Sequence, residues 1–200
     1  MAHNQINQDI GSISANLYYL YNLVELDLSN NFIWGPLPHF LCKTTITNLN
    51  LNNNNISGDF NFDDKQASCS FARIGLSENK LSGALIYDLT KLPRLTDLYI
   101  DNNQLHGKLP KFLPTSIKRL DLHNNKFEGT IPKQWNSLSE LFYIDLTGNS
   151  FCGCIPENWK DNPWRNCILG GLKMNCNCRV PSLCSYDKCE ASVNDTCCGV

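Results

Sequence analysis

The chain has 200 residues, enough for one or two compact domains with a buried core. Its net charge is −2 at pH 7 with both signs interspersed, which argues against a protein that binds nucleic acid or an anionic membrane. No apolar run approaches the ~18 residues of a membrane span, and residues 1–11 lack the charged and apolar segments of a signal peptide.

A repeat begins near residue 23 and occurs six times. Its most regular position is an asparagine that recurs at intervals of 23, 25, 24, 22 and 24 residues: Asn31, Asn54, Asn79, Asn103, Asn125 and Asn149. Two aliphatic residues, such as Leu26 and Leu28, precede each asparagine, and an apolar residue, a glycine, a second apolar residue and in four units a proline follow it. Such self-similarity predicts a stacked, solenoid-like protein.

One step before Asn31 lies Asn7, where Gly11 and Ile13 keep the spacing but Asp9 replaces the apolar residue. We therefore interpret residues 1–22 as a degenerate N-terminal repeat and residues 23–159 as six repeats. Residues 160–200, where the pattern is lost, are interpreted as a cysteine-rich C-terminal cap.

The chemistry of each repeat position agrees with this interpretation. Leu26 and Leu28 are two residues apart and would point to one face of a short strand. A buried asparagine needs partners for its amide, so side chains such as that of Asn79 should bond to the backbone of adjacent coils. No unit can bury its apolar face alone, and stacking is obligatory.

These units resemble the leucine-rich repeat family in its plant-type form, LxxLxLxxNxLxGxIPxxLxxL, over roughly residues 4–160. The resemblance implies an α/β solenoid with a concave parallel β-sheet and short 3-10 or helical turns on the convex side. We expect such turns after Pro132 and Pro156 and extra convex chain at residues 61–71.

The residues between the strand leucines are expected to point to solvent on the concave face. Tyrosine and arginine often contribute most of the energy of binding. We predict a surface that binds a protein or glycan, formed by Arg73, Asp97, Tyr99, Asp101, Arg119, Asp121, His123, Tyr143 and Asp145.

Asp121 and His123, two apart on one strand, raise the alternative of a metal site or an acid–base pair. A neighbouring carboxylate would favour protonated His123. Because no nucleophile with a base and an orienting group is evident, we predict solvated polar neighbours, with no catalytic residue, metal or cofactor.

Asn55 and Asn194 begin Asn-X-Ser/Thr sequences, and Asn55 occupies an exposed repeat position. We therefore predict glycosylation at both, with Asn55 the stronger candidate.

Eleven cysteines indicate an oxidising, extracellular or cell-surface location. We therefore expect that a signal peptide has been removed or that the chain is a piece of a longer precursor. Cys42 and Cys69 lie near corresponding positions of neighbouring coils and are predicted to pair. The other nine are predicted to form structural disulfides of open connectivity, one cysteine being left over: Cys152, Cys154, Cys167, Cys176, Cys178, Cys184, Cys189, Cys197 and Cys198. Zinc is the weaker alternative, since the cap contains no histidine.

The cap should cover the apolar flank of the last coil. Trp159, Trp164, Ile168 and Leu172 are the residues expected to pack there. Cys152 and Cys154 are expected to face outward from the last full repeat and to anchor the tail.

A narrower resemblance rests on Trp135 and Trp159, each three residues after a repeat proline, the sequence FCGCIP at residues 151–156 and the cysteine-rich tail. These features look like the leucine-rich-repeat surface antigens of kinetoplastid protozoa. That family implies an exposed cell-surface glycoprotein with roles in adhesion.

We predict a non-enzymatic extracellular recognition or adhesion module. A structural subunit of an extracellular fibre or coat is the alternative, because no cysteine-rich cap precedes Asn7 and an open first coil could receive another subunit. An inhibitor of a secreted hydrolase would use the same concave surface as the first of these.

Overall fold

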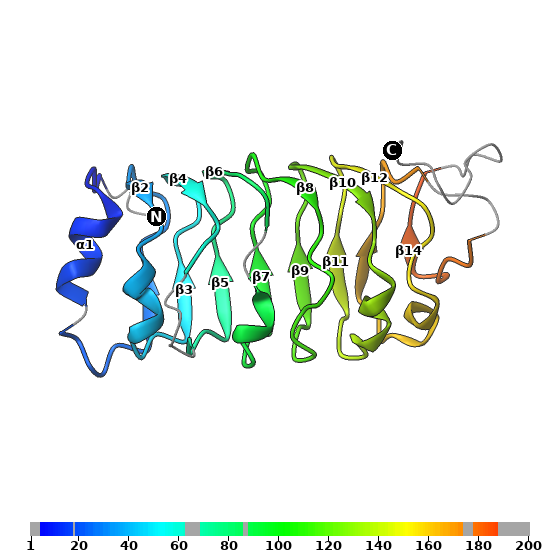
Figure 1. Ribbon diagram of the computed structural model, residues 1–200, viewed down its shortest axis with the longest axis horizontal. Helices are drawn as coiled ribbons and strands as arrows, with labels where there is room; N and C mark the ends of the chain where they lie inside the picture. Colours follow the sequence, from blue (N-terminus) through cyan, green and yellow to red (C-terminus); the bar gives the residue numbers. More distant parts are fainter. Residues whose placement is uncertain (1–4, 18, 63–68, 86–87, 174–177, 188–200) are drawn as a thin grey trace.

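The computed structural model describes residues 5–17, 19–62, 69–85, 88–173 and 178–187. In these residues a parallel sheet of eight strands runs the length of the molecule, with each strand beside that of the next coil (Figure 1). The strands are β1 (Glu25–Asp27), β3 (Asn48–Asn50), β5 (Arg73–Gly75), β7 (Asp97–Tyr99), β9 (Arg119–Asp121), β11 (Tyr143–Asp145), β13 (Asn166–Ile168) and β14 (Cys184–Ser185). The sheet confirms the predicted leucine-rich repeat solenoid.

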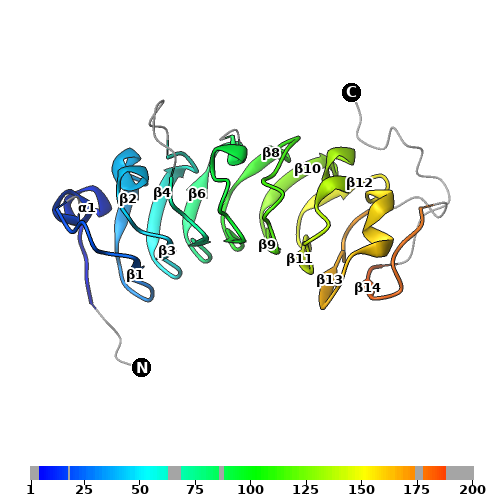
Figure 2. The ribbon, with the colours of Figure 1, turned by 90° about the horizontal axis from the view of Figure 1, so that it is seen from below.

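Two smaller parallel sheets and a series of short helices complete the coils. The strands of these sheets are β2 (Trp34–Pro36), β4 (Asn55–Asp59), β6 (Lys80–Ser82), β8 (His106–Lys108), β10 (Lys126–Thr130) and β12 (Ser150–Cys152). The helices are α1 (Ile10–Leu17) and the 3-10 turns η1 (His39–Lys43), η2 (Leu89–Lys91), η3 (Lys133–Ser137) and η4 (Glu157–Asp161). Figure 2 shows the eight-stranded sheet on the inner side of an arc, with the 3-10 turns outside, as expected after Pro132 and Pro156.

The apolar repeat positions form one continuous core. Leu49, Leu51 and Ile56 of the second full coil are almost completely buried, as are Leu98 and Ile100 of the fourth. Since each side chain packs between two coils, burial of one coil depends on its neighbours.

The repeated asparagines form the predicted ladder of hydrogen bonds between coils. The Nδ2 group of Asn103 donates to the carbonyl of Leu76 in the preceding coil (2.9 Å) and to those of Ile100 and Asp101 in its own. Its Oδ1 accepts from the backbone N–H of Leu81 at 2.9 Å. Each such asparagine thereby satisfies backbone groups that the strands leave unpaired.

The turn before each ladder asparagine requires a left-handed backbone. Asn30, Asn53, Asn102 and Asn124 occupy this position with φ between 49° and 57°, Glu78 does so with φ 55°, and Gly148 with φ 67°. Asparagine and glycine tolerate this conformation better than most residues. This requirement explains the repeated Asn-Asn pairs of the sequence, which the spacing of the ladder alone does not.

Backbone hydrogen bonds place the chain before the first full coil in a register that differs from the sequence interpretation by three residues. Gly11 and Ile13 lie within α1 and do not take repeat positions. Instead, the backbone of Phe32 donates to Ile6 and that of Trp34 to Gln8, as Gln104 and His106 donate to Leu81 and Gly83 in a regular coil. Ile10, 1% exposed, fills the position of Leu85. Gln8 at the glycine position hid this register.

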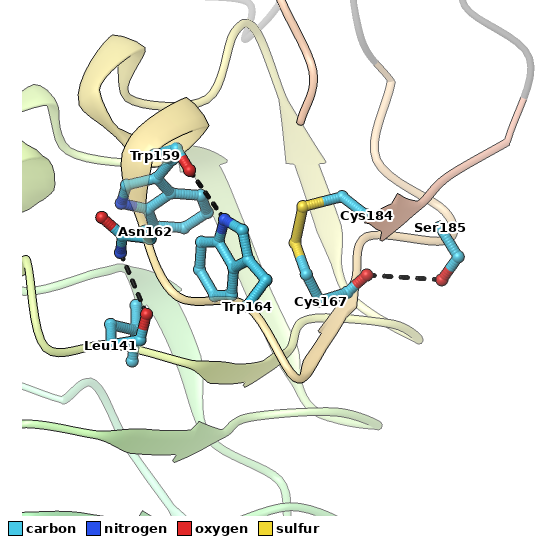
Figure 3. The surroundings of a disulfide bond; sticks show 7 residues. All are labelled: Leu141, Trp159, Asn162, Trp164, Cys167, Cys184 and Ser185. Atoms are coloured by element: carbon cyan, nitrogen blue, oxygen red, sulfur yellow. Dashed lines mark hydrogen bonds between the residues drawn. A yellow bond between two sulfur atoms is a disulfide. The ribbon is translucent and has the colours of Figure 1, made fainter. Parts of the chain in front are cut away.

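The main sheet continues beyond Trp159, where the sequence pattern stops. Cys167 of β13 pairs in register with Ile144, and Cys184 of β14 pairs with Cys167. Each of these buried cysteines therefore takes, on its own strand, the position of a repeat leucine. Figure 3 shows the Cys167–Cys184 disulfide joining these strands beside Trp159 and Trp164. Of the expected cap contacts, Trp159, Trp164 and Leu172 are buried, whereas Ile168 is only half-buried because Leu169 takes the inward position.

Disulfides hold the convex side and the cap. Cys42 pairs with Cys69 as predicted, and Cys154 pairs with Cys178. Cys152 is disulfide-bonded too, but the expectation that it faces outward is wrong: it is 3% exposed, and its backbone bridges to Lys173. The calls on Cys176, Cys189, Cys197, Cys198 and Asn194 lie outside the described residues.

Among the described residues, none of the helices has the length and apolar character that a membrane span requires.

Candidate functional site: the concave face

The strand register sets three rows of side chains across the concave sheet. The first row is Glu25, Asn48, Arg73, Asp97, Arg119 and Tyr143. The second is Asp27, Asn50, Gly75, Tyr99, Asp121 and Asp145. The residues two positions later form the third: Ser29, Asn52, Ser77, Asp101, His123 and Thr147. The structure therefore places all nine predicted binding residues on one face.

Four of these residues do not point freely into solvent as expected. Asp97, Asp101, Asp121 and Asp145 are between 3% and 9% exposed. Burial of a carboxylate is costly unless charged or hydrogen-bonding groups surround it, and longer side chains of neighbouring strands supply those groups. The aspartates therefore form a lower layer, beneath arginine, histidine and tyrosine.

Asp97 organises the arginines of the first row. Arg119 Nη1 lies 2.5 Å from Asp97 Oδ1, and Thr96 Oγ1 donates to Oδ2 at 2.7 Å. The guanidinium of Arg119 also lies over the Phe142 ring, 4.7 Å from its centroid. Arg73 makes a looser contact, with 3.8 Å between its Nε and Asp97 Oδ2, and its side chain is 55% exposed. Arg73 is thus the more accessible of the two cations.

A second cluster surrounds His123. Its Nδ1 lies 2.6 Å from Asp121 Oδ1, and Tyr143 donates its hydroxyl to Asp121 Oδ2 at 3.0 Å. The Nε2 atom of His123 faces Asn102 Nδ2 at 3.0 Å and Asp101 Oδ2 at 3.8 Å. The cluster ties three adjacent strands together through polar side chains.

Burial and charge shift the titration of this cluster. Burial lowers the pKa of His123, but its hydrogen bond to Asp121 and the charges of Asp121, Asp101 and Asp145 outweigh burial, so the pKa is raised. Burial raises the pKa of Asp121 despite the bond from His123. Burial and the charge of Asp121 raise the pKa of Tyr143, which keeps its hydroxyl a donor.

The geometry of this cluster favours a binding surface over acid–base chemistry. One ligand atom from each of Asp101, Asp121 and His123 falls within 4.8 Å of the others, the proximity that a cation site would need. Both oxygens of Asp121 already accept hydrogen bonds, however, from His123 and Tyr143. Within the described part of the chain, no hydroxyl or thiol hydrogen-bonds to His123, so no nucleophile is paired with it.

A cavity that the sequence did not predict opens nearer the N-terminal end of this face. It has a volume of about 240 Å³ and lies between the first two rows, over β1, β3 and β5, with Tyr99 of β7 at its end. Its walls are Glu25, Asp27, Asn48, Asn50, Asn52, Arg73, Gly75 and Tyr99, and Leu26 and Leu49 also line it. We call it the Gly75 trough. The signal in the sequence was Gly75 itself, a glycine in a row of larger residues.

The glycosylation candidate Asn55 lies at the start of β4, away from the concave sheet, and is exposed. Attachment of sugar there stays a prediction.

Comparison with known proteins agrees with the repeat architecture. A sequence model of the family Leucine Rich Repeat matches residues 22–44, 94–115 and 116–138. Pollen receptor-like kinase 2 of Arabidopsis thaliana is 30% identical over 129 residues, which are 64% of this chain and 20% of that protein. The chain thus spans about a fifth of this relative's length.

Solved structures give the same picture. The Arabidopsis receptor kinase HAESA, in complex with the peptide hormone IDA and the co-receptor SERK1, superposes with a TM-score of 0.77 at 28% identity, covering 88% of this chain and 29% of that one. A pollen receptor kinase 3 superposes with a TM-score of 0.61 at 35% identity, over 70% of this chain and 68% of its own. These are plant-type receptors, and the comparisons do not support the narrower resemblance to kinetoplastid surface antigens.

Proposed function

The chain belongs to the leucine-rich repeat family, and on this premise we propose that it is an extracellular, non-enzymatic recognition module that binds a protein ligand on its concave face. Its similarity to HAESA, a receptor kinase crystallised with a peptide hormone and a co-receptor, supports a protein ligand. The disulfides support an oxidising, extracellular location.

One observation carries this proposal: the concave face combines a fixed polar framework with accessible groups. The aspartates hold Arg119, His123 and Tyr143 in position through hydrogen bonds, so these side chains are already ordered before a ligand arrives. Ordering side chains in advance lowers the entropic cost of binding.

Charge reversal at Arg73 tests the proposal at an exposed position of the concave face. Arg73 is half exposed, and among the described residues its ion pair is the 3.8 Å contact with Asp97. Arg119 is a poor choice, because its removal would leave the buried Asp97 without its closest partner. We expect Arg73→Glu to reduce capture of the extracellular ligand from native extract by at least about tenfold. The exposed Arg94, outside the concave strands, provides the matched control Arg94→Glu. Equal capture by all three proteins would contradict concave-face binding.

A second candidate function, a subunit of an extracellular fibre or coat, has one observation in its favour. Apolar side chains of the first coil are exposed: Tyr19, Leu20, Tyr21, Val24, Phe32 and Trp34. A contact between this end and the other end of a second copy would propagate. Light scattering on the purified chain separates the two candidates, since a strict monomer at all concentrations contradicts the fibre.

A further inference from the structure

We propose that the Gly75 trough binds an extended segment of the protein ligand that carries a basic and an acidic side chain two residues apart. The basic side chain lies at Glu25 and Asp27, and the acidic one lies beside Gly75, at Arg73 and Tyr99. This inference rests on the proposed function and adds the chemistry that the ligand must have.

The trough exists because the second row loses a side chain at Gly75. Asn50 and Tyr99 flank Gly75 in register on β3 and β7, so the row has no side chain of its own between them. The amides of Asn52 and Asn50 lie close over the buried Gly75: a Cβ atom on residue 75 would come within 2.9 Å of Asn52 Oδ1 and 3.3 Å of Asn50 Oδ1. The volume of about 240 Å³ is smaller than the ~300–1,000 Å³ of sites that enclose a small molecule. It suits side chains of a chain that passes over the sheet.

Unused donors at one end of the trough fit a carboxylate. Arg73 has one loose ion pair, which leaves most of its N–H groups for a ligand. The hydroxyl of Tyr99 forms no hydrogen bond to any described residue, in contrast to that of Tyr143. Burial raises the pKa of Tyr99, so the hydroxyl keeps its proton and donates. A carboxylate beside Gly75 would accept charge-assisted bonds from both groups.

The opposite end of the trough fits a cation. Glu25 accepts one hydrogen bond, from Asn48 Nδ2 at 2.7 Å, and Asp27 accepts from Ser29 and Asn50. In the described part of the chain neither carboxylate has a basic partner within 4 Å. Although burial raises the pKa of Asp27, the hydrogen bonds from Ser29 and Asn50 outweigh it and lower the pKa. Both carboxylates are therefore available to a lysine or arginine of the ligand.

The spacing of the two ends sets the spacing in the ligand. Strands β1 and β5 are two strand intervals apart, or about 10 Å. In an extended peptide, side chains two residues apart point the same way and lie about 7 Å apart at the backbone, and a long basic side chain bridges the remainder. A ligand with the same charge at both positions would place one of them against a group of like sign and be rejected.

A library of displayed random peptides, selected for binding to the immobilised 200-residue chain, tests this inference without knowledge of the native ligand. We expect the enriched peptides to share a basic and an acidic residue two positions apart. A synthetic consensus peptide should bind at least about tenfold more weakly to Arg73→Gln and to Gly75→Asn, which fills the trough with the residue of the neighbouring strand. Arg94→Gln should bind as the unaltered chain does, and thermal unfolding should show all variants folded.

The inference would be overturned if the enriched peptides lacked the acidic residue. It would also be overturned if the consensus peptide bound Arg73→Gln and Gly75→Asn as tightly as the unaltered chain. The native ligand gives an independent readout. If Arg73→Glu loses that ligand while Gly75→Asn keeps it, concave-face recognition stands and the trough is excluded. If neither variant affects its capture, both proposals fail.

Discussion

Asn103 shows how a single side chain supports two coils. Its amide bonds to three carbonyls and one N–H, and the residue is 8% exposed. In Asn103→Ala these backbone groups would be left without partners in a site that water reaches poorly. We expect the free energy of unfolding in urea to fall by about 1–3 kcal/mol for each group left unsatisfied.

The control for this substitution is Asn48→Ala on the concave surface. Asn48 makes one exposed side-chain bond, to Glu25, and its loss should change stability by no more than about 0.5 kcal/mol. Equal effects of the two substitutions would show that the ladder contributes little to stability.

His123 should make stability depend on pH. Its folded pKa is raised above the unfolded value by Asp121, Asp101 and Asp145, which outweigh burial. A raised pKa means that the folded state holds the proton more tightly, so this stabilisation is complete below the unfolded pKa and is lost as pH rises through the folded pKa. We expect the difference in free energy of unfolding between the unaltered chain and His123→Gln to shrink from pH 5 to pH 9.

The groups that face His123 are the carboxylates of Asp101, Asp121 and Asp145 on the concave face and the amide of Asn102 in the turn after β7. Histidines elsewhere, such as His106 on β8, serve as the comparison. If the stability difference for His123→Gln were constant with pH, or grew as pH rose, the ion pair with Asp121 would not form as described.

At the scale of elements, tryptophans link the convex turns much as asparagines link the strands. Trp135 Nε1 donates to the carbonyl of Pro110, Trp159 to that of Trp135, and Trp164 to that of Trp159. The sequence drew attention to Trp135 and Trp159 only through a family resemblance. Their physical role is to bind each turn to the chain before it.

The Cys167–Cys184 disulfide should fix the last strand of the sheet. Removing both sulfurs in Cys167→Ala/Cys184→Ala takes away a cross-link over 17 residues and about 2–4 kcal/mol of local stability. We expect hydrogen exchange, followed by mass spectrometry, to rise in β13 and β14 while β3 to β9 stay protected. Cys42→Ala/Cys69→Ala should instead raise exchange around η1. A uniform rise in both variants would mean that the solenoid unfolds as a single unit.

Some elements could not be recognised from the sequence. In these elements the residue type at a repeat position differs from the pattern, although the backbone follows the same path as in the other coils. Cys167 and Cys184 take leucine positions, and a cysteine is recognised from sequence as a cross-link before it is recognised as a core residue. Gln8 takes a glycine position, and for this reason the register predicted for the N-terminal unit differs from the observed one by three residues. The burial of Asp97 and Asp121 depends on Arg119 and Tyr143 from neighbouring strands, a contact that the period-two pattern of a single strand cannot show.

On the scale of the whole molecule, the arc has two chemically different surfaces. The inner sheet is polar, with aspartates below and Arg73, Tyr99, His123 and Tyr143 above them. The outer turns carry the buried tryptophans and the Cys42–Cys69 disulfide. The turns that carry these residues thus lie on the opposite side of the arc from the surface that we propose for binding (Figure 2).

Site-specific photo-cross-linking tests the central claim most directly. A photoreactive amino acid replaces Asn48 on the concave face in one protein and the exposed Lys91 of η2 in another, and each is irradiated with native extracellular extract. We predict that the same ligand protein cross-links to position 48 and not to position 91, and that excess unlabelled chain abolishes the product. Cross-linking at position 91 alone, or equally at both positions, would contradict recognition by the concave face.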